Sequence, residues 1–479
     1  MPQPPEAQEA ALEEAASEND AKTPTPVTSK KIIRRDPDAQ HGRYASNDYT
    51  GCAIVKITHE TLQVGSFCPG CAEAGLKGKL GPLKPGLIIR LESNPLISGT
   101  RYEVEKLRCH LCGDQYVASV PEEIAKREKF SPGCRAAIAV GHYYFGLPFH
   151  RIERWQALHG IPLPDATQFD QVNKLYNQVK PVHTAMEEIA AEGRLFYYDD
   201  TPSIILFHKL AGNTGKSVYT TAIISQVGQN TIQLFYTGPG VAHERFEALL
   251  AKREGLEPML TMTDASRSNI PRHVNLKVWI SWVLCFCLVH GRRQFYEIRE
   301  CFTPHCDFVI DQIAKVYEHE AFCKKEKFTP QERLAYHQTH SSPVMQALWI
   351  WLNNQLLYRS AEPNSGLGVA IRYMLRYWRA LTRFLHYADA PIDNSWSERL
   401  VKIIIRYRNN ALFFKTDRGA HIGDGLMSLI QTAIQAKVNP FHYLTTLQKH
   451  AESVAQEPHL WLPWNYQATQ ASLVSTIAA

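Results

Sequence analysis

The 479-residue sequence has no uncharged apolar run of about 18 residues, the length that a membrane-spanning helix needs. Its start also lacks a basic segment followed by an apolar one, which is the pattern of a secretion signal. We therefore expect no membrane insertion and a cytoplasmic location. A large charge excess is missing too, because 52 Lys and Arg stand against 47 Asp and Glu. Any binding of nucleic acid must come from local basic patches.

The 11 cysteines are odd in number and follow no secretion signal, which argues against a disulfide scaffold. Four of them form two CxxC pairs, Cys68 with Cys71 and Cys109 with Cys112. Two such pairs supply the four thiolates of a tetrahedral structural Zn²⁺ site. Buried or redox-active thiols are the alternative. We expect a zinc-binding module over residues 51–125.

Residues 1–50 are rich in Ala, Glu, Pro and Thr and predict a disordered arm. The arm carries the basic patch 30–35, which either contacts phosphates or is simply solvated. Residues 126–192 predict a helical region interrupted by a turn at 160–164. This outline fits a helix-turn-helix DNA-binding region and equally well any helical hairpin.

Three acidic residues stand in settings that could bring them together. Asp199 follows the apolar run 195–198, which predicts a short buried strand ending at the acid. Asp264 ends the apolar run 259–263, and Glu398 lies just inside a helix start at 393–395. Carboxylates are the oxygen ligands that Mg²⁺ and Mn²⁺ prefer. The three acids therefore predict a site for divalent metal and phosphoryl transfer on DNA.

The order of predicted elements supports this placement. A strand is followed by a hairpin over 217–236, a helix over 242–252, the strand before Asp264, and a further strand over 278–289. This order opens an α/β ribonuclease-H-like fold, in which acids follow the first and fourth strands and a third lies on a late helix. We expect this core over 193–450, with a large helical insertion at about 296–390 and a C-terminal tail at 451–479.

Basic residues flank the proposed acidic site. His290, Arg292 and Arg293 come after the expected fifth strand, where they either contact DNA phosphates or form a solvated turn. Around Glu398, a helix places Lys402 and Arg406 on the same stripe as the acid, next to Arg399. Glu398 alone also fits a capping box that begins at Ser395. The cationic stripe favours the catalytic interpretation, because a capping residue does not require it.

The sequence resembles the insertion sequence 66 family of transposases from about Cys68 to Leu447. The likeness rests on several motifs in the right order: both CxxC pairs, Asp199-Asp200-Thr201-Pro202, Asp264-Ala265, His290-Gly291-Arg292-Arg293-Gln294-Phe295, Ile392-Asp393-Asn394-Ser395-Trp396-Ser397-Glu398-Arg399 and Leu426-Met427-Ser428-Leu429-Ile430-Gln431-Thr432-Ala433. The sequence departs from that pattern at Tyr198 and at Leu288-Val289, and it shows no N-terminal coiled coil.

The resemblance implies that Asp199, Asp264 and Glu398 form a catalytic DDE triad holding Mg²⁺ or Mn²⁺. It further implies cleavage and strand transfer at the ends of an insertion sequence, with DNA as the partner. A homo-oligomer on DNA, accessory proteins of the same element and association with the nucleoid are further expectations. The alternative function is a DNA-binding protein that descends from a transposase and has lost catalysis.

Overall fold

The computed structural model describes residues 61–73, 75–82, 96–108, 115–210, 217–272 and 282–478. The chain divides into two units, Met1–Ser93 and Asn94–Ala479. In the first unit, helix α2 (Pro69–Glu73) lies between Phe67 and Lys79, which form an isolated antiparallel bridge. The predicted N-terminal arm 1–50 with its basic patch lies outside the described residues, as do Cys109 and Cys112.

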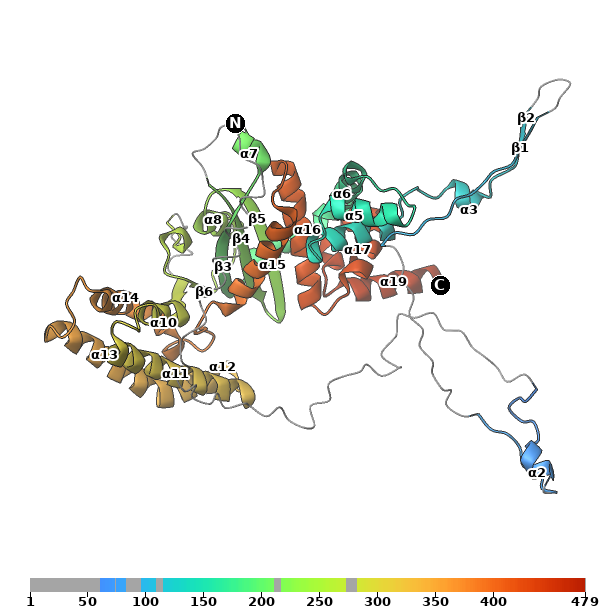
Figure 1. Ribbon diagram of the computed structural model, residues 1–479. Coiled ribbons are helices and arrows are strands. Elements are labelled where there is room, and N and C mark those ends of the chain that lie inside the picture. Colours follow the sequence, from blue (N-terminus) through green and yellow to red (C-terminus); the bar gives the residue numbers. More distant parts are fainter. Residues whose placement is uncertain are drawn as a thin grey trace, which may run out of the picture. The chain divides into compact units, whose positions relative to one another are not determined.

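A five-stranded mixed sheet forms the centre of the second unit. Its strands are β3 (Leu195–Ser203), β4 (Val218–Val227), β5 (Asn230–Pro239), β6 (Met259–Thr263) and β7 (Trp282–Phe286), in the order β5-β4-β3-β6-β7. β3, β4 and β5 pair antiparallel, whereas β6 and β7 run parallel to β3 (Figure 1). The predicted order of three strands, a helix and two strands is confirmed, since α8 (Ala242–Leu250) lies between β5 and β6. This α/β core is consistent with a ribonuclease-H-like fold.

Two predicted strand boundaries are wrong. β3 does not end at Asp199 but continues to Ser203, because β4 stays paired with it over its whole length. β6 pairs only with residues 195–197, so beyond Tyr197 one edge of β3 is open and tolerates Pro202. The apolar run 278–289 is not one strand: β7 ends at Phe286, and helix α10 (Leu288–Tyr296) begins within the run. Periodicity alone cannot separate a buried strand from a buried helix start.

The segment before the sheet holds the hairpin β1 (Lys106–Arg108) and β2 (Gln115–Val117), then α3 (Glu122–Ala125) and α4 (Pro132–Ala139). A π-helical turn η3 (Val140–Tyr144) leads to α5 (Phe149–Leu158) and the 27-residue α6 (Asp165–Ala191). One face of α6 is buried along its length, from Val172 to Met186, and packs against α4, α16 and α18.

The stretch between α10 and the last acid is helical, as predicted. It comprises α11 (Thr303–Lys325), α12 (Pro330–Tyr336), η5 (His337–Ser341), α13 (Ser342–Leu357), α14 (Gly366–Leu381) and η6 (Arg383–Leu385). α14 packs against β7 and α10. The approach to α10 is close, because a Cβ on Gly291 would lie 2.6 Å from Met374 Sδ. The glycine of the His290–Phe295 motif therefore has a packing role.

The chain closes with α15 (Ser395–Ala411), α16 (Asp417–Gln435), α17 (Pro440–Lys449), α18 (Ala451–Gln456), η7 (Pro458–Trp461) and α19 (Tyr466–Ala478). α15 packs on β3 and β4, and α16 packs along β5 (Figure 1). The segment expected as a C-terminal tail is helical, and its Trp461 is fully buried. Within the described part of the chain, no helix combines the length and apolarity needed to cross a membrane.

Candidate active site

The two faces of β3 separate Asp199 from Asp200. Successive strand residues point to opposite sides. Tyr197 packs edge-on against Trp396 of α15, and Thr201 accepts a hydrogen bond from Arg408 of the same helix (3.2 Å). Asp199 lies between them on this face. Asp200 belongs to the other face, where its Oδ2 accepts from the backbone N–H of Ala242 at the start of α8 (3.2 Å). Only Asp199 therefore faces the helix that carries Glu398.

Asp264 lies directly after β6, next to Asp199. β6 pairs with β3 so that Met262 lies opposite Tyr197. The same register continued by two residues brings Asp264 beside Asp199. Its Oδ1 accepts hydrogen bonds from the side-chain amide of Asn269 and from the backbone N–H of Ser266. These donors hold the carboxylate at the end of the strand.

Tyr198 supports the loop that follows Asp264. Its ring is fully buried and stacks on Phe246 of α8 at 4.5 Å, and its hydroxyl donates to the backbone carbonyl of Asn269 (2.6 Å). The side chain of Asn269 in turn donates to Asp264. Tyr198, which precedes Asp199, thus holds the loop whose Asn269 orients Asp264.

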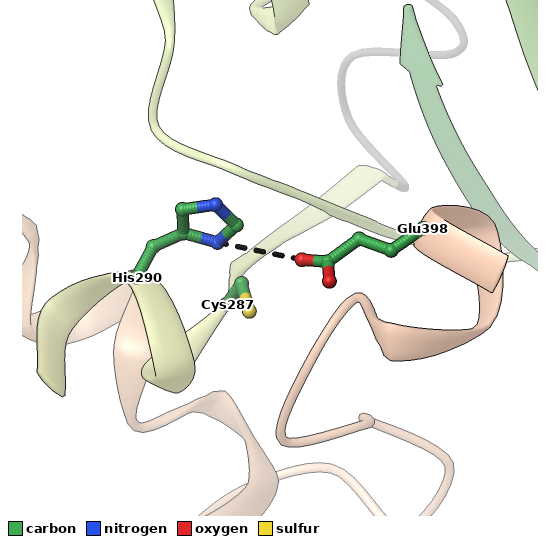
Figure 2. A group of neighbouring side chains, drawn as sticks. All are labelled: Cys287, His290 and Glu398. Carbon is green, nitrogen blue, oxygen red and sulfur yellow. Dashed lines mark ion pairs between the residues drawn. The ribbon is translucent and has the colours of Figure 1, made fainter. Parts of the chain in front are cut away.

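Glu398 lies in the first turn of α15 and does not cap it. The N-cap is Asn394, one residue earlier than the capping box would require, and its side chain makes no capping hydrogen bond. The backbone N–H of Ser395 instead donates to Asp393 Oδ1 (3.0 Å). The capping-box interpretation is therefore wrong. Glu398 lies opposite His290 of α10, with 3.9 Å between Nδ1 and Oε1, and the two side chains point toward each other (Figure 2). The carboxylate is 38% exposed, so it remains accessible from solvent.

The charges of the neighbouring acids act on Asp199. Burial, and next the charge of Asp264, raises the pKa of Asp199 to about 7, and the charges of Asp200 and Glu398 act in the same direction. The backbone N–H of Asp200 opposes this shift through its hydrogen bond to Asp199 Oδ1 (2.9 Å). Among the described residues, no cation lies within ion-pair distance of Asp199. The carboxylates thus accumulate negative charge that a divalent cation would neutralise, and their oxygen donors fit Mg²⁺ or Mn²⁺.

The three carboxylates are not all in mutual contact. In the described part of the chain, the group of three ligand atoms that lie within 4.8 Å of one another is Cys287, His290 and Glu398. Asp199, Asp264 and Glu398 form no such group. Asp199 and Asp264 are neighbours on β3 and β6, whereas Glu398 faces them from α15.

The predicted DNA-binding cations lie on the two helices that meet near Glu398. The fifth strand ends before them, so His290, Arg292 and Arg293 belong to α10 and not to a strand-end turn. Arg292 lies over the ring of Tyr296 at 5.5 Å, and Arg293 is exposed. On α15, Lys402 and Arg406 are exposed, and Arg406 donates to the carbonyl of Tyr144 (2.9 Å).

Arg399 is exposed and lines a cavity of about 480 Å³ at the start of α15. Lys324 and Arg333 from the helical insertion line the same cavity, as do the rings of Tyr197 and Trp396. Arg333 is paired with the carboxylate of Glu320 at 2.8 Å, so its charge is largely neutralised. Arg399 has no ion-pair partner among the described residues, and its charge is available to an anion.

The two cysteines of the first CxxC pair lie at the start of α2. Cys68 directly precedes this helix, and Cys71 lies in its first turn. A hydrogen bond and the charge of Cys68 raise the pKa of Cys71. A Cβ on Gly78 would lie 2.6 Å from Cys71 Sγ, so only glycine lets the backbone approach the sulfur this closely. In the sequence, Cys109 and Cys112 fall between β1 and β2.

Sequence reasoning overlooked two residues of this region. Asn269, which holds Asp264, carries no local sequence signal. Cys287 lies beside Glu398 and His290, and the pattern Cys287-x-x-His290 would have revealed it, because cysteine and histidine one helical turn apart are a common pair of metal ligands.

Comparisons with known proteins agree with the resemblance found in the sequence. The family model described as Transposase IS66 family matches residues 127–422, more than half of the chain. Three proteins of Sinorhizobium fredii are similar, each named only as uncharacterized. Protein y4jD is 28% identical over 191 residues, y4hP 22% over 393 residues and y4qI 24% over 344 residues. The matches cover 39%, 78% and 69% of this chain and 37%, 69% and 62% of those relatives.

Proposed function

Since the chain belongs to the IS66 family of transposases, we propose that it catalyses metal-dependent DNA strand cleavage and strand transfer at the ends of an insertion sequence. The catalytic residues are Asp199, Asp264 and Glu398, on a ribonuclease-H-like core. The observation that carries this proposal is that the fold gathers the three acids around β3 from distant parts of the sequence: Asp199 lies on β3, Asp264 directly follows its parallel neighbour β6, and Glu398 lies in the first turn of α15, which packs on β3.

In this proposal the residues have separate tasks. Asp199 on β3 and Asp264 directly after β6 would hold the divalent ion, and Glu398 would approach it from α15. When bound, the ion would supply an activated oxygen nucleophile and stabilise the leaving oxygen of the phosphodiester. Asn269 and Ser266 keep Asp264 in place, and Asp200 fastens β3 to the start of α8. No covalent intermediate with the protein is needed.

Cations around the site bind the DNA backbone in this proposal. His290, Arg292 and Arg293 on α10 flank the acid, together with Arg399, Lys402 and Arg406 on α15. Arg372, Arg376 and Arg379 form a further exposed row on α14. The net charge of the chain is only +5, so phosphate binding must come from local groups of basic side chains. The three helices supply such groups.

The region 126–192 is also proposed to contact DNA, but through α5. In a helix-turn-helix the second helix reads the DNA. Here the second helix, α6, is buried along one face, whereas α5 exposes Arg151, Arg154 and Trp155. A homo-oligomer on the DNA, accessory proteins of the element and a cytoplasmic location at the nucleoid belong to the same proposal.

The zinc module rests on Cys68, Cys71, Cys109 and Cys112. Metal binding would supply much of the folding free energy of such a small module. Freshly purified protein should then carry about one tightly bound Zn²⁺ per chain in this module. Cys109→Ser should release that ion and make the segment sensitive to protease. Protein that keeps the same zinc content after Cys109→Ser would exclude this set of ligands.

The catalytic proposal is tested with Asp199→Asn and its neighbour Asp200→Asn. Both variants remove a charge from β3, but only Asp199 faces α15. On DNA that carries the ends of the element, with Mg²⁺, Asp199→Asn should cut at least about a hundredfold more slowly while binding the ends normally. Asp200→Asn keeps an oxygen acceptor for Ala242 and should cut within about tenfold of the parent. Equal or reversed effects would refute the assignment, and a parent that binds the ends without cutting would identify the inactive DNA-binding descendant.

A further inference from the structure

Cys287, His290 and Glu398 gather between the starts of two helices. Cys287 is the N-cap of α10, and His290 follows one turn later on the same side of the helix. Glu398 approaches from α15. One possible ligand atom of each residue lies within 4.8 Å of the other two. Figure 2 shows the imidazole and the carboxylate facing each other, with the sulfur of Cys287 beside the gap.

Backbone contacts hold the two helix starts in this arrangement. The N–H of Leu288 donates to the carbonyl of Ile392 (3.0 Å), and the N–H of Asn394 donates to Cys287 Sγ (3.3 Å). Both bonds tie the residues next to His290 to the residues just before Glu398. Gly291 anchors α10 on Met374 from the other side. The fold therefore holds the three side chains close together through these backbone contacts.

His290 has an unused coordination position in this group. Its Nδ1 is buried and has no hydrogen-bond partner among the residues that the structure describes, although Glu398 Oε1 lies 3.9 Å away. A buried polar atom without a partner costs about 1 to 3 kcal/mol. A metal ion between the two residues would take up the lone pair of Nδ1.

The donor set selects the metal. A sulfur, an imidazole nitrogen and a carboxylate oxygen are the ligands of Zn²⁺, whereas Mg²⁺ takes oxygen donors almost alone. Tetrahedral Zn²⁺ with bonds of about 2.1 Å keeps neighbouring nitrogen and oxygen ligands about 3.4 Å apart. The 3.9 Å between His290 and Glu398 exceeds this by about half an ångström, which a side-chain rotation closes.

We propose that Cys287, His290 and Glu398 form a Zn²⁺ site that withdraws Glu398 from the catalytic acids and so inhibits DNA cleavage. The fourth position is left for water. The inhibitory part rests on the proposed function, but the binding of Zn²⁺ does not. Because binding is reciprocal, occupation of the catalytic site would in turn weaken Zn²⁺ here.

Metal uptake tests the site without any measurement of activity. Full-length protein is treated with a mild chelator and titrated with Zn²⁺ by calorimetry and with Co²⁺ by absorption, where thiolate ligation gives a charge-transfer band. The parent should bind one ion more per chain than Cys287→Ser, with a correspondingly stronger band. Cys285→Ser changes a fully buried cysteine of β7 outside the group and should match the parent. Equal uptake by the parent and Cys287→Ser would overturn the site.

Zinc inhibition tests its consequence. Cleavage at fixed Mg²⁺ is measured with and without Zn²⁺, and each protein is compared with itself. In Cys287→Ser, the Zn²⁺ concentration that inhibits cleavage by half should be at least about tenfold higher than in the parent. Thermal melts first establish that each variant is folded, and His290→Gln replaces Cys287→Ser if the latter is not. Lost uptake with unchanged inhibition would overturn the competition for Glu398. If the parent cuts no DNA at all, the proposed function fails, while metal uptake still decides the zinc site.

Discussion

Asp199 on β3 is a half-buried carboxyl and Asp424 on α16 a buried one, and desolvation raises the pKa of each to about 7. Their surroundings differ. Asp424 accepts hydrogen bonds from the backbone N–H and the hydroxyl of Thr237, at 2.6 and 2.7 Å. Asp199 accepts one bond from its own neighbour and faces the charges of further acids. A buried carboxyl whose oxygens accept hydrogen bonds has a structural role. Carboxyls that repel one another at an open strand edge instead indicate a binding site.

Asp424 belongs to a repeating contact that closes the edge of the sheet. Ser428 and Thr432 follow it at intervals of four residues and accept from the N–H groups of Phe235 and Gln233, each at 3.0 Å. Four helical residues rise about 6 Å and two strand residues about 6.6 Å, so the spacings match. α16 thereby covers an edge strand that would otherwise offer free backbone donors. This explains the polar positions within the motif 426–433.

Among the changes that test this difference between the acids, we expect Glu398→Gln to have the largest effect, on the rate of DNA cleavage. Because the carboxylate caps no helix end, its loss should leave the free energy of unfolding within about 0.5 kcal/mol of the parent. Cleavage of element ends with Mg²⁺ should fall at least about a hundredfold, with DNA binding retained. Asp389→Asn, a nearby surface acid, serves as the control. A Glu398→Gln protein that cuts nearly as fast as the parent would place the third carboxylate elsewhere.

The opposite outcome is expected for Asp424→Ala. This change removes the acceptor of the Thr237 N–H at a part-buried position, while the Thr237 hydroxyl keeps Thr220 as a partner, so the free energy of unfolding should drop by about 1 to 3 kcal/mol. Asp417→Ala, at the exposed start of the same helix, should cost less than about 1 kcal/mol. Denaturant titration measures both. A small effect at Asp424 would mean that the edge contact contributes little and that the two acids differ less than the geometry implies.

Sequence reasoning recovers the order of strands, the position of Asp264 directly after β6 and the position of Glu398 in the first turn of a helix, because these follow from local apolar runs and their boundaries. It fails where a contact with a residue far away in the sequence determines where a strand or helix begins or ends. β3 continues past Asp199 because β4 remains paired after β6 has ended. α10 starts at Leu288 because its first N–H binds Ile392, about a hundred residues later. The contact of Cys287 with Glu398 depends on the same distant segment.

The pH dependence of stability sharpens the difference between the acids. The pKa of Asp424 rises from 3.8 to about 7 on folding, so the folded protein keeps a proton that the unfolded chain releases. Its contribution to stability is complete below about pH 4 and is lost as the pH rises through about 7. Asp424→Asn keeps an acceptor for Thr237 but cannot titrate. Between pH 4 and 8 the variant should therefore gain stability relative to the parent, by up to about 4 kcal/mol.

Denaturant unfolding of both proteins at several pH values measures this gain. Asp199 is present in both, so its own titration cancels in the difference. Asp417→Asn, an exposed acid of the same helix, should show a difference that varies little with pH. A constant difference between Asp424→Asn and the parent would mean that Asp424 stays ionised when folded.

The smallest effect is expected at Lys402, which tests whether the cations around the acid serve DNA. Lys402 is exposed on α15, one turn beyond Glu398. If it contacts one phosphate, Lys402→Ala should weaken DNA binding several-fold and lower the slope of log affinity against log salt by about 1. The loss should be similar for different DNA sequences, because a phosphate contact carries no base information. Lys449→Ala, at an exposed position of α17, is the control and should leave the slope unchanged. An unchanged slope in Lys402→Ala would mean that Lys402 contacts no DNA phosphate and that this face of α15 is only solvated. Lys402 would then no longer support a catalytic role for Glu398.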